Sequence, residues 1–365
     1  MDKNKRIMFF ITGLRMGGAE RQVCDLADQF AAMGCHILLV SMTGDIVNIP
    51  RSKLIEVVSL NMGKSPIGII RAYLKARALV REFQPDVVHS HMVHANIFSR
   101  ILRLSTRFPR LICTAHNTNE GGRARVIAYR LTDSLCDVST NVSQEAVDAF
   151  VAQGAVPAGR MCAMYNGIDT TRFDFDPDNR QRSRLELGLS SGEKLLLAVG
   201  RLNLQKDYPN LIYALSYLSV SQSQLQLAII GVGEEHAKLT ELVASLGLTS
   251  RVHFLGIKHN VHEWMSAADI FVLSSAWEGF GLVVAEAMAC QRVVVATDCG
   301  GVKEVVGECG ILVPPRDHLA LADGINTALQ MSSDEIEMIG AAARNRIVTR
   351  YSLNAQVESW LSLYQ

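Results

Sequence analysis

The chain has 365 residues, 48% hydrophobic and 20% charged, a composition typical of globular enzymes. This length favours two domains, because a single hydrophobic core rarely grows beyond about 250 to 300 residues. The 36 basic and 36 acidic residues cancel, which argues against a nucleic-acid-binding protein, and no apolar run approaches the roughly 20 residues that span a bilayer.

The N-terminus places charged residues before an apolar run, as a signal peptide does. The run is short, ends in glycines and lacks a small-residue cleavage site, so we interpret it as a buried first strand. The eight cysteines form no Cys-x-x-Cys pair and lie mostly in apolar segments, which favours reduced core thiols over disulfides or zinc ligands. We therefore expect a cytoplasmic protein.

In the first half of the chain, short runs rich in Val, Ile and Leu alternate with segments of helical period. The clearest helices are predicted at 19–33 and 69–83. Strands are predicted at 6–12, 36–42, 86–91, 110–116 and 138–143. Apolar strands that alternate with helices indicate a parallel sheet covered on both faces.

The second half repeats this pattern after a polar, turn-rich linker at 166–183. Strands are predicted at 194–202, 225–231, 252–256, 269–275, 293–297 and 311–315. The sequence thus predicts an α/β protein of two doubly wound domains, 1–168 and 169–350, that face each other across a cleft. A C-terminal helix in 351–365 is expected to pack back on the first domain. In such folds ligands bind at the carboxyl ends of the strands.

The turn after the first strand contains Gly13, Gly17 and Gly18, directly before the helix that begins near Ala19. Glycines let the backbone approach a ligand, and a helix N-terminus offers N–H groups to an anion. The turn is a candidate phosphate site. Its spacing is not Gly-x-Gly-x-x-Gly, so by itself it is weak evidence.

The turn after the strand at 194–202 carries Arg201 and, five residues later, Lys206. The planar fork of arginine and the point charge of lysine together suit the two phosphates of a diphosphate. Either residue alone would be interpreted as a solvated loop cation. Both together at the carboxyl end of a strand favour an anion site.

Two carboxylates, Glu278 and Glu286, lie in the otherwise apolar or small-residue stretch SSAWEGFGLVVAEAMAC. Gly279 and Gly281 predict a tight turn, and a helix beginning near Leu282 would carry Glu286. A carboxylate that leaves water needs partners, and it only accepts hydrogen bonds, so a neutral polyhydroxy ligand would supply hydroxyl donors. Together with the basic turn, these residues indicate a diphosphate joined to sugars.

The motifs GGAER, HSH, TAHN, NGID, GRLNLQK and EGFGLVVAEA resemble glycosyltransferase family 4, the retaining nucleotide-sugar transferases with the two-domain GT-B fold. The match runs essentially end to end. It implies that Glu278 binds hydroxyls of the donor sugar, Glu286 binds the ribose, and Arg201 with Lys206 binds the diphosphate. The remaining donor contacts would come from the backbone at Gly17, Gly18, Gly279, Phe280, Gly281 and Leu282.

The same resemblance makes His116, in TAHN, the active-site histidine beside the donor sugar, and it makes the first domain the acceptor domain. Without the family context His116 would be interpreted as a structural hydrogen-bonding residue. His91 is expected to line the acceptor side, with His94 and Asn117 as possible neighbours. The implied catalytic set is His116, Glu278, Arg201 and Lys206.

Two patterns suggest a metal. His89 and His91 share one face of a strand, but no third ligand is evident. Asp174 and Asp176 imitate the Asp-x-Asp of another glycosyltransferase fold, but they lie in the linker, so we interpret them as a solvated, turn-forming cluster. We expect neither a metal nor another cofactor.

The charge is divided unequally between the halves. Residues 1–168 contain 20 basic and 13 acidic residues, a net charge of +7, and the remaining residues have 16 and 23, a net charge of −7. The predicted helix at 69–83 carries Arg71, Lys75, Arg77 and Arg81, and further basic residues follow at Arg100, Arg103, Arg107 and Arg110. A solvated face and docking on an anionic membrane both explain this pattern.

The sequence therefore predicts a retaining transferase, peripheral on the inner face of the cytoplasmic membrane. It would move a hexose or N-acetylhexosamine from a UDP-sugar to a lipid-linked saccharide of bacterial surface polysaccharide such as O antigen. Because no carboxylate nucleophile is evident, a front-face route is favoured. The alternatives are a GT-B transferase with a soluble acceptor, and a catalytically silent sugar-nucleotide-binding partner, whose expected loss of Glu278, Lys206 or His116 is not seen.

Overall fold

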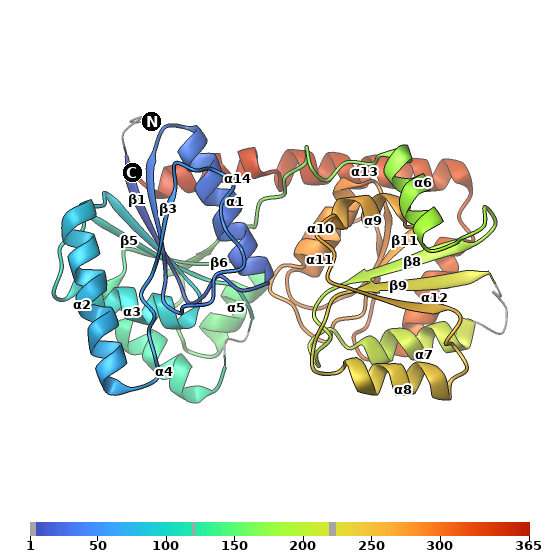
Figure 1. Ribbon diagram of the computed structural model, residues 1–365, viewed down its shortest axis with the longest axis horizontal. Coiled ribbons are helices and arrows are strands. Elements are labelled where there is room, and N and C mark those ends of the chain that lie inside the picture. The colour runs from blue at the N-terminus through green and yellow to red at the C-terminus, as the bar shows by residue number, and fades with distance from the viewer. Residues whose placement is uncertain (1–4, 119–120, 219–223) are drawn as a thin grey trace. The chain divides into compact units, whose positions relative to one another are not determined.

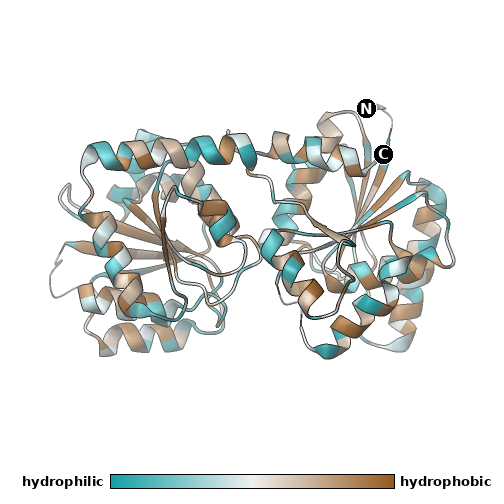
Figure 2. Cartoon of the chain, turned by 180° about the vertical axis from the view of Figure 1, so that it is seen from behind, coloured by the Kyte–Doolittle hydropathy of each residue, from teal (hydrophilic) through white to brown (hydrophobic). Residues whose placement is uncertain are grey.

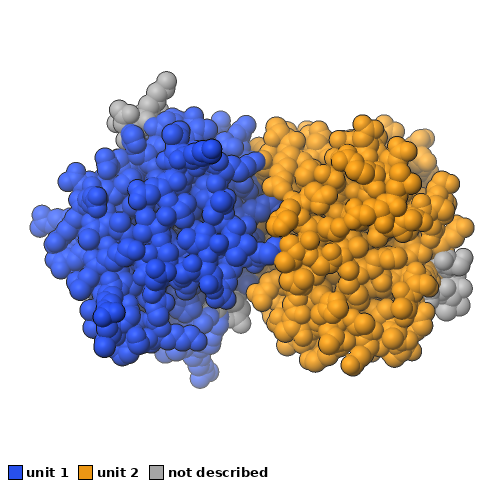
Figure 3. All heavy atoms as spheres, in the orientation of Figure 1, with its two compact units in different colours: residues 1–167, 353–365 blue, residues 168–352 orange. Residues whose placement is uncertain are grey.

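The computed structural model describes residues 5–118, 121–218 and 224–365, and in it the chain divides into two units (Figure 1). Unit 1 comprises residues 1–167 and 353–365, and unit 2 comprises residues 168–352 (Figure 3). The strands of each unit carry mostly hydrophobic residues, whereas the helices around them have mixed faces (Figure 2). This distribution is typical of parallel sheets buried on both sides.

Unit 1 contains a seven-stranded parallel sheet in the order β3-β2-β1-β4-β5-β6-β7. Its strands are β1 (Arg6–Ile11), β2 (His36–Ser41), β3 (Glu56–Ser59), β4 (Val87–His91), β5 (Arg110–Ala115), β6 (Val138–Asn141) and β7 (Met161–Ala163). Its helices are α1 (Gly18–Ala32), α2 (Pro66–Phe83), α3 (Val93–Arg103), α4 (Arg123–Thr132), α5 (Gln144–Ala152) and α14 (Leu353–Leu363), with a 3-10 helix at Asp133–Leu135.

Side chains alternate between the two faces of this sheet, as the strand period requires. Phe9 of β1 lies in a core with Phe30 of α1 and Trp360 of α14. Its neighbour Phe10 lies in the opposite core with Ala72 of α2. The C-terminal helix α14 therefore completes one face of the first sheet.

Unit 2 contains a six-stranded parallel sheet in the order β10-β9-β8-β11-β12-β13. Its strands are β8 (Lys194–Val199), β9 (Leu225–Ile230), β10 (Val252–Gly256), β11 (Ile270–Leu273), β12 (Val293–Thr297) and β13 (Ile311–Val313). Its helices are α6 (Pro177–Glu186), α7 (Tyr208–Leu218), α8 (His236–Ser245), α9 (Val261–Ala267), α10 (Leu282–Ala289), α11 (Val302–Val306), α12 (His318–Leu329) and α13 (Ser333–Arg350).

All eleven predicted strands are present, and the predicted helices at 19–33 and 69–83 correspond to α1 and α2. The sequence missed β3 and β7, which are only four and three residues long and incompletely buried. It also missed α6 inside the predicted linker, although Asp176 caps this helix and Pro177 occupies its first turn. All eight cysteines are free, as predicted. Over the described ranges, no helix combines the length and apolar character needed to cross a bilayer.

Candidate functional site

The loop that carries Glu278 connects β11 to α10 in unit 2. It ends at Gly281, the N-cap of α10, whose φ of +84° lies in the left-handed region that favours glycine. A Cβ on Gly300 would lie 1.9 Å from the carbonyl oxygen of Glu278, so the turn after β12 packs directly on this loop. The Gly301 N–H also donates to the Gly279 carbonyl at 3.2 Å. The neighbouring turn therefore fixes the backbone that presents Glu278.

The structure brings Glu278 and Lys206 together. Lys206 Nζ lies 2.5 Å from Glu278 Oε1, and the Ser275 hydroxyl donates to the same oxygen at 2.7 Å. The Gln205 amide lies 3.4 Å from the other carboxylate oxygen. The lysine and glutamate side chains are only 15% and 9% exposed, so this ion pair is largely removed from solvent. Such a pair is stable only with good geometry and additional hydrogen bonds, which Ser275 supplies.

Gly200, at the end of β8, allows Lys206 to reach this position. A Cβ on Gly200 would lie 2.6 Å from Lys206 Cε, and the φ of this glycine is +159°. Arg201 follows it on the same turn, but its side chain is 66% exposed and lies 3.9 Å from Glu234. The predicted cation pair thus consists of one shielded lysine and one exposed arginine.

Glu286 lies on α10 and is buried, together with Phe280 in the preceding loop. The ring of Phe280 packs edge-on against Tyr351 at 5.6 Å between centroids. Leu282 is the first residue of α10, as the sequence predicted. The first N–H groups of any helix have no partner further back within the helix, so the start of α10 at Leu282 can offer backbone donors to an anion.

Gly17 and Gly18 lie in unit 1, at the exposed N-terminus of α1. Gly17 is the N-cap, and a Cβ there would lie 2.3 Å from the Glu20 carboxylate. An acidic side chain in the first helical turn interacts favourably with the helix dipole. A phosphate bound at this end of α1 would compete with Glu20.

His91 and His116, from β4 and the residue after β5, are in contact. Nδ1 of His91 lies 3.0 Å from Nε2 of His116. His91 is only 1% exposed, and burial lowers its pKa well below 6.5. Burial likewise lowers the pKa of His116 to about 4, so both rings are neutral near pH 7.

The other two predicted acceptor-side residues lie nearby in sequence but differ in environment. His94 is exposed on α3, and partial burial with the neighbouring Arg125 lowers its pKa. The Asn117 backbone carbonyl accepts a hydrogen bond from Asn141 at 3.2 Å, and its side-chain oxygen accepts one from the Thr118 N–H at 2.9 Å. Asn117 therefore shapes the loop after β5.

His89 has a structural role that the sequence did not reveal. One ring nitrogen lies 2.6 Å from the Tyr364 hydroxyl, which follows α14, and the other lies 2.7 Å from the Thr114 hydroxyl. Both nitrogens are thus engaged by protein groups. A metal held by His89 would have to break these two bonds.

The two linker aspartates also have structural partners. Asp176 caps α6 by accepting hydrogen bonds from the N–H groups of Asp178 and Asn179 at 2.8 and 3.2 Å. Asp174 pairs with Arg344 of α13 at 3.0 Å. The Asp174 contact ties this segment to α13, whereas the Asp176 contacts are local to the start of α6.

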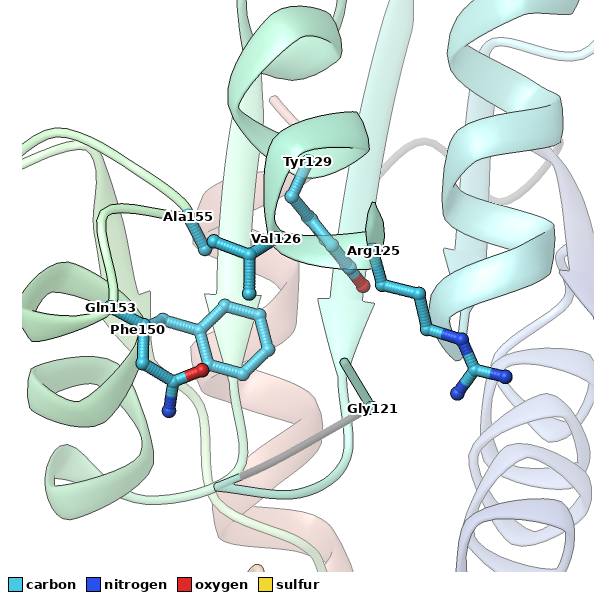
Figure 4. Close-up of a pocket in the computed structure, with 7 residues that line it drawn as sticks. All are labelled: Gly121, Arg125, Val126, Tyr129, Phe150, Gln153 and Ala155. Atoms are coloured by element: carbon cyan, nitrogen blue, oxygen red, sulfur yellow. The ribbon is translucent and has the colours of Figure 1, made fainter. Parts of the chain in front are cut away.

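A small cavity lies between α4 and α5 (Figure 4). Val126, Tyr129, Phe150 and Ala155 line it, and its volume of about 10 Å³ suffices for one water molecule at most. A nucleotide or a sugar does not fit in it.

Two family models match most of the chain. Residues 16–172 match the family model described as Glycosyltransferase Family 4, and residues 179–346 match the model described as Glycosyl transferases group 1. The putative glycosyltransferase EpsD of Bacillus subtilis is 27% identical over 85% of this chain and 84% of that protein.

Two further relatives extend this comparison. The N-acetylgalactosamine-N,N'-diacetylbacillosaminyl-diphospho-undecaprenol 4-alpha-N-acetylgalactosaminyltransferase of Campylobacter jejuni is 26% identical over 95% of this chain and 94% of that enzyme. The crystal structure of Anabaena HepE in complex with UDP-glucose superposes with a TM-score of 0.84 and 25% identity, over 98% of this chain and 99% of HepE. The chain is therefore a glycosyltransferase of family 4 with the GT-B fold.

Proposed function

We propose that this glycosyltransferase moves a hexose or N-acetylhexosamine from a UDP-sugar to a lipid-linked saccharide, with retention of configuration at the anomeric carbon. The product would belong to a bacterial surface polysaccharide of the O-antigen type. The Campylobacter relative is named for an undecaprenyl-diphosphate-linked saccharide, and HepE binds UDP-glucose. The observation in this chain that carries the proposal is the shielded contact of Lys206 with Glu278.

Lys206 suits a ligand in which a diphosphate adjoins a sugar. Its ammonium group has three N–H donors, so it can hold Glu278 with one and donate to a phosphate oxygen with another. The carboxylate then accepts hydrogen bonds from sugar hydroxyls beside the phosphate. Glu286 would bind the ribose hydroxyls, and the exposed Arg201 would close on the diphosphate. His116 would contact the donor sugar.

The partners of Glu278 also favour a front-face route. A carboxylate that is neutralised by Lys206 and hydrogen-bonded by Ser275 is a weak nucleophile but a well-oriented acceptor for hydroxyls. In the proposed reaction the acceptor oxygen bonds to the anomeric carbon as the bond from that carbon to the phosphate oxygen breaks, on the same face. The acceptor proton passes to the departing phosphate. Lys206 and Arg201 stabilise the charge that develops on this phosphate.

A membrane-docking surface on unit 1 would bring the enzyme to a lipid-linked acceptor. Helix α2 has three exposed apolar side chains: Ile67, Ile70 and Leu74 are 65%, 58% and 54% exposed. Their spacing aligns them on one face of the helix. Arg71 and Arg81 are exposed beside them. Apolar side chains flanked by basic residues are typical of helices that lie in the headgroup region of anionic bilayers.

Helix α4 extends this surface. Like α2, it packs against α3. Ile127 and Leu131 are exposed on it, with the basic residues Arg123, Arg125 and Arg130 and no acidic residue. Docking through α2 and α4 would place the protein on the inner face of the cytoplasmic membrane. Residues 1–168 carry a net charge of +7, which is opposite in sign to that of an anionic membrane surface and therefore favours docking on it.

The decisive experiment is an assay with a panel of UDP- and GDP-sugars, with and without a lipid-linked saccharide. We expect slow hydrolysis of one UDP-sugar alone and faster transfer with the lipid-linked acceptor, and both rates should be much lower in Glu278→Gln. Equal transfer to the same saccharide without its lipid would favour the soluble-acceptor alternative. Nucleotide binding without turnover under any condition would favour the silent binding partner.

A further inference from the structure

The contact between His91 and His116 determines which nitrogen of each ring carries a proton. Both rings are neutral near pH 7, so each has one N–H and one bare nitrogen. A hydrogen bond across 3.0 Å requires that one partner donates and the other accepts. Two arrangements are therefore open, and they give His116 opposite tautomers.

The surroundings of His91 distinguish the two arrangements. Its Nε2 is buried and has no hydrogen-bond partner among the residues that the structure describes. If His116 donated, His91 would carry its proton on this Nε2, and a buried N–H would be left unpaired. Unpaired buried N–H groups are rarer in proteins than unsatisfied acceptors. If His91 instead donates from Nδ1, its buried Nε2 carries no proton and no N–H group is left unpaired there.

The ring of His91 is also held in place. It lies 4.0 Å from the ring of His89 and 5.8 Å from that of Phe9, measured between centroids. His89 is itself fixed by Tyr364 and Thr114. His91 pairs with Thr114 in the sheet register, two residues before His116. His91 is thus a rigid group with one nitrogen directed at His116.

We propose that His91 is a positioning residue: its Nδ1–H donates to Nε2 of His116 and thereby keeps the proton of His116 on Nδ1. In this tautomer the N–H donor of His116 is at Nδ1, and its Nε2 is not available as a base. The role in catalysis rests on the proposed transfer reaction, whereas the tautomer does not depend on it.

Long-range proton–nitrogen NMR spectra of the histidine-labelled full chain test this directly, because protonated and bare ring nitrogens resonate in separate regions. We expect His116 to show a protonated Nδ1 and a bare Nε2. In His91→Phe, which keeps a ring against His89 but removes both nitrogens, Nε2 of His116 should become partly protonated. His91→Asn, whose amide can donate from a similar position, should restore the wild-type pattern. His116→Gln assigns the signals.

His89→Phe is the matched control. It changes an adjacent buried ring without altering His116, so the His116 signals should stay in place.

In the transfer assay, His91→Phe should lower kcat by about 2- to 10-fold, as for one neutral hydrogen bond, with little change in KM. His91→Asn should recover part of this loss. A wild-type His116 protonated on Nε2, or unchanged signals in His91→Phe, would overturn the proposal. If His91→Phe does not fold, the wild-type and His91→Asn spectra still decide. Absence of turnover with every nucleotide sugar would contradict the proposed function and leave the spectra unaffected.

Discussion

Lys206 Nζ lies 2.5 Å from Glu278 Oε1, and this pair links the turn after β8 to the loop after β11. The carboxylate holds the lysine that is proposed to bind the diphosphate. The two functions that the sequence assigned to separate residues are therefore coupled. Substitution of either residue should affect the other.

Glu278→Gln should lower turnover far more than nucleotide binding. The amide keeps the size of the side chain but weakens the hydrogen bonds to sugar hydroxyls, at a cost of about 1.5 to 3 kcal/mol, or roughly 10- to 100-fold in kcat. UDP contains no transferred sugar, and Lys206 is released from its carboxylate partner, so UDP should bind at least as tightly as in the wild type. Calorimetry with UDP and steady-state kinetics measure the two effects.

Glu286→Gln is the matched control for this change, because it alters a second buried carboxylate of the same motif. A ribose contact is present with or without the sugar, so this variant should lose UDP affinity. If UDP binding collapsed in Glu278→Gln and not in Glu286→Gln, the two roles would be exchanged.

Lys206→Ala and Arg201→Ala should both weaken UDP binding and transfer, but only the first should destabilise the fold. Loss of Lys206 removes the cation from a carboxylate that is 9% exposed, whereas Arg201 is 66% exposed. We expect Lys206→Ala to cost roughly 2 to 5 kcal/mol in UDP affinity, as for a desolvated charge contact, and to lower Tm. Arg201→Ala should leave Tm unchanged.

The double variant Lys206→Ala with Glu278→Gln tests the cause of the lower Tm. It removes both charges together, so it should recover most of the thermal stability lost in Lys206→Ala. Equal Tm values for the single and double variants would show that the buried charge is not the cause.

The strands could be predicted from sequence because apolar runs that alternate with glycine-containing turns and helical segments are typical of strands in a buried parallel sheet. The types of the candidate residues were also predictable, since arginine, lysine and glutamate at strand ends suit phosphates and hydroxyls. The contact between Lys206 and Glu278 was not predictable, because it joins residues 72 positions apart through the sheet order. The path of the Lys206 side chain also passes where a Cβ on Gly200 would lie, and local pattern does not reveal this.

The histidine cluster shows the same limit. The spacing of His89 and His91 placed both on one face of a strand, which the sheet confirms. Their different partners depend on β5 and on Tyr364, which follows α14 and is 275 positions from His89. Only the assembled unit assigns a structural role to His89 and a contact with His116 to His91.

The buried histidines should make the fold sensitive to acid. Burial holds the pKa of His116 at about 4 and those of His89 and His91 well below 6.5, whereas the unfolded chain titrates near 6.5. The unfolded state therefore binds more protons as pH falls below 6.5. The free energy of unfolding therefore keeps its full contribution from the neutral rings above pH 6.5. It decreases as the pH falls towards 4, by up to about 1.4 kcal/mol per pH unit for each ring.

Urea unfolding of the wild type and of His116→Gln at pH 7 and at pH 5 measures this effect. The variant lacks one of the three rings, so its stability should fall less between the two pH values. Parallel pH profiles for the two proteins would show that His116 does not remain neutral in the folded state.

Transfer should continue in excess EDTA, since Asp174 and Asp176 have structural partners and the proposed reaction neutralises the diphosphate with Lys206 and Arg201. Asp176→Ala should lower stability by about 1 kcal/mol through loss of the α6 cap, and Asp176→Asn, which can still cap, should lose much less. Both variants should keep their activity with and without added Mg²⁺. A strict requirement for Mg²⁺ or Mn²⁺ that these substitutions abolish would make the two aspartates a metal site.

The surface on α2 should bind anionic membranes through both its charges and its apolar side chains. Vesicles that contain phosphatidylglycerol should sediment the wild-type protein at low salt and release part of it at high salt, because the Debye length shrinks from about 10 Å at 0.1 M to about 3 Å at 1 M. Arg71→Glu with Arg81→Glu should abolish binding at low salt, since each basic residue contributes about 1 kcal/mol.

The apolar side chains of α2 are tested separately. Ile67→Ser with Leu74→Ser should abolish the fraction of vesicle binding that remains at high salt. Met338→Ser on α13, also exposed by about two thirds, controls for loss of an apolar side chain elsewhere. All these variants should bind UDP normally. If the charge-reversed protein sedimented with vesicles as much as the wild type does, α2 would be a solvent-exposed helix face without a role in membrane binding.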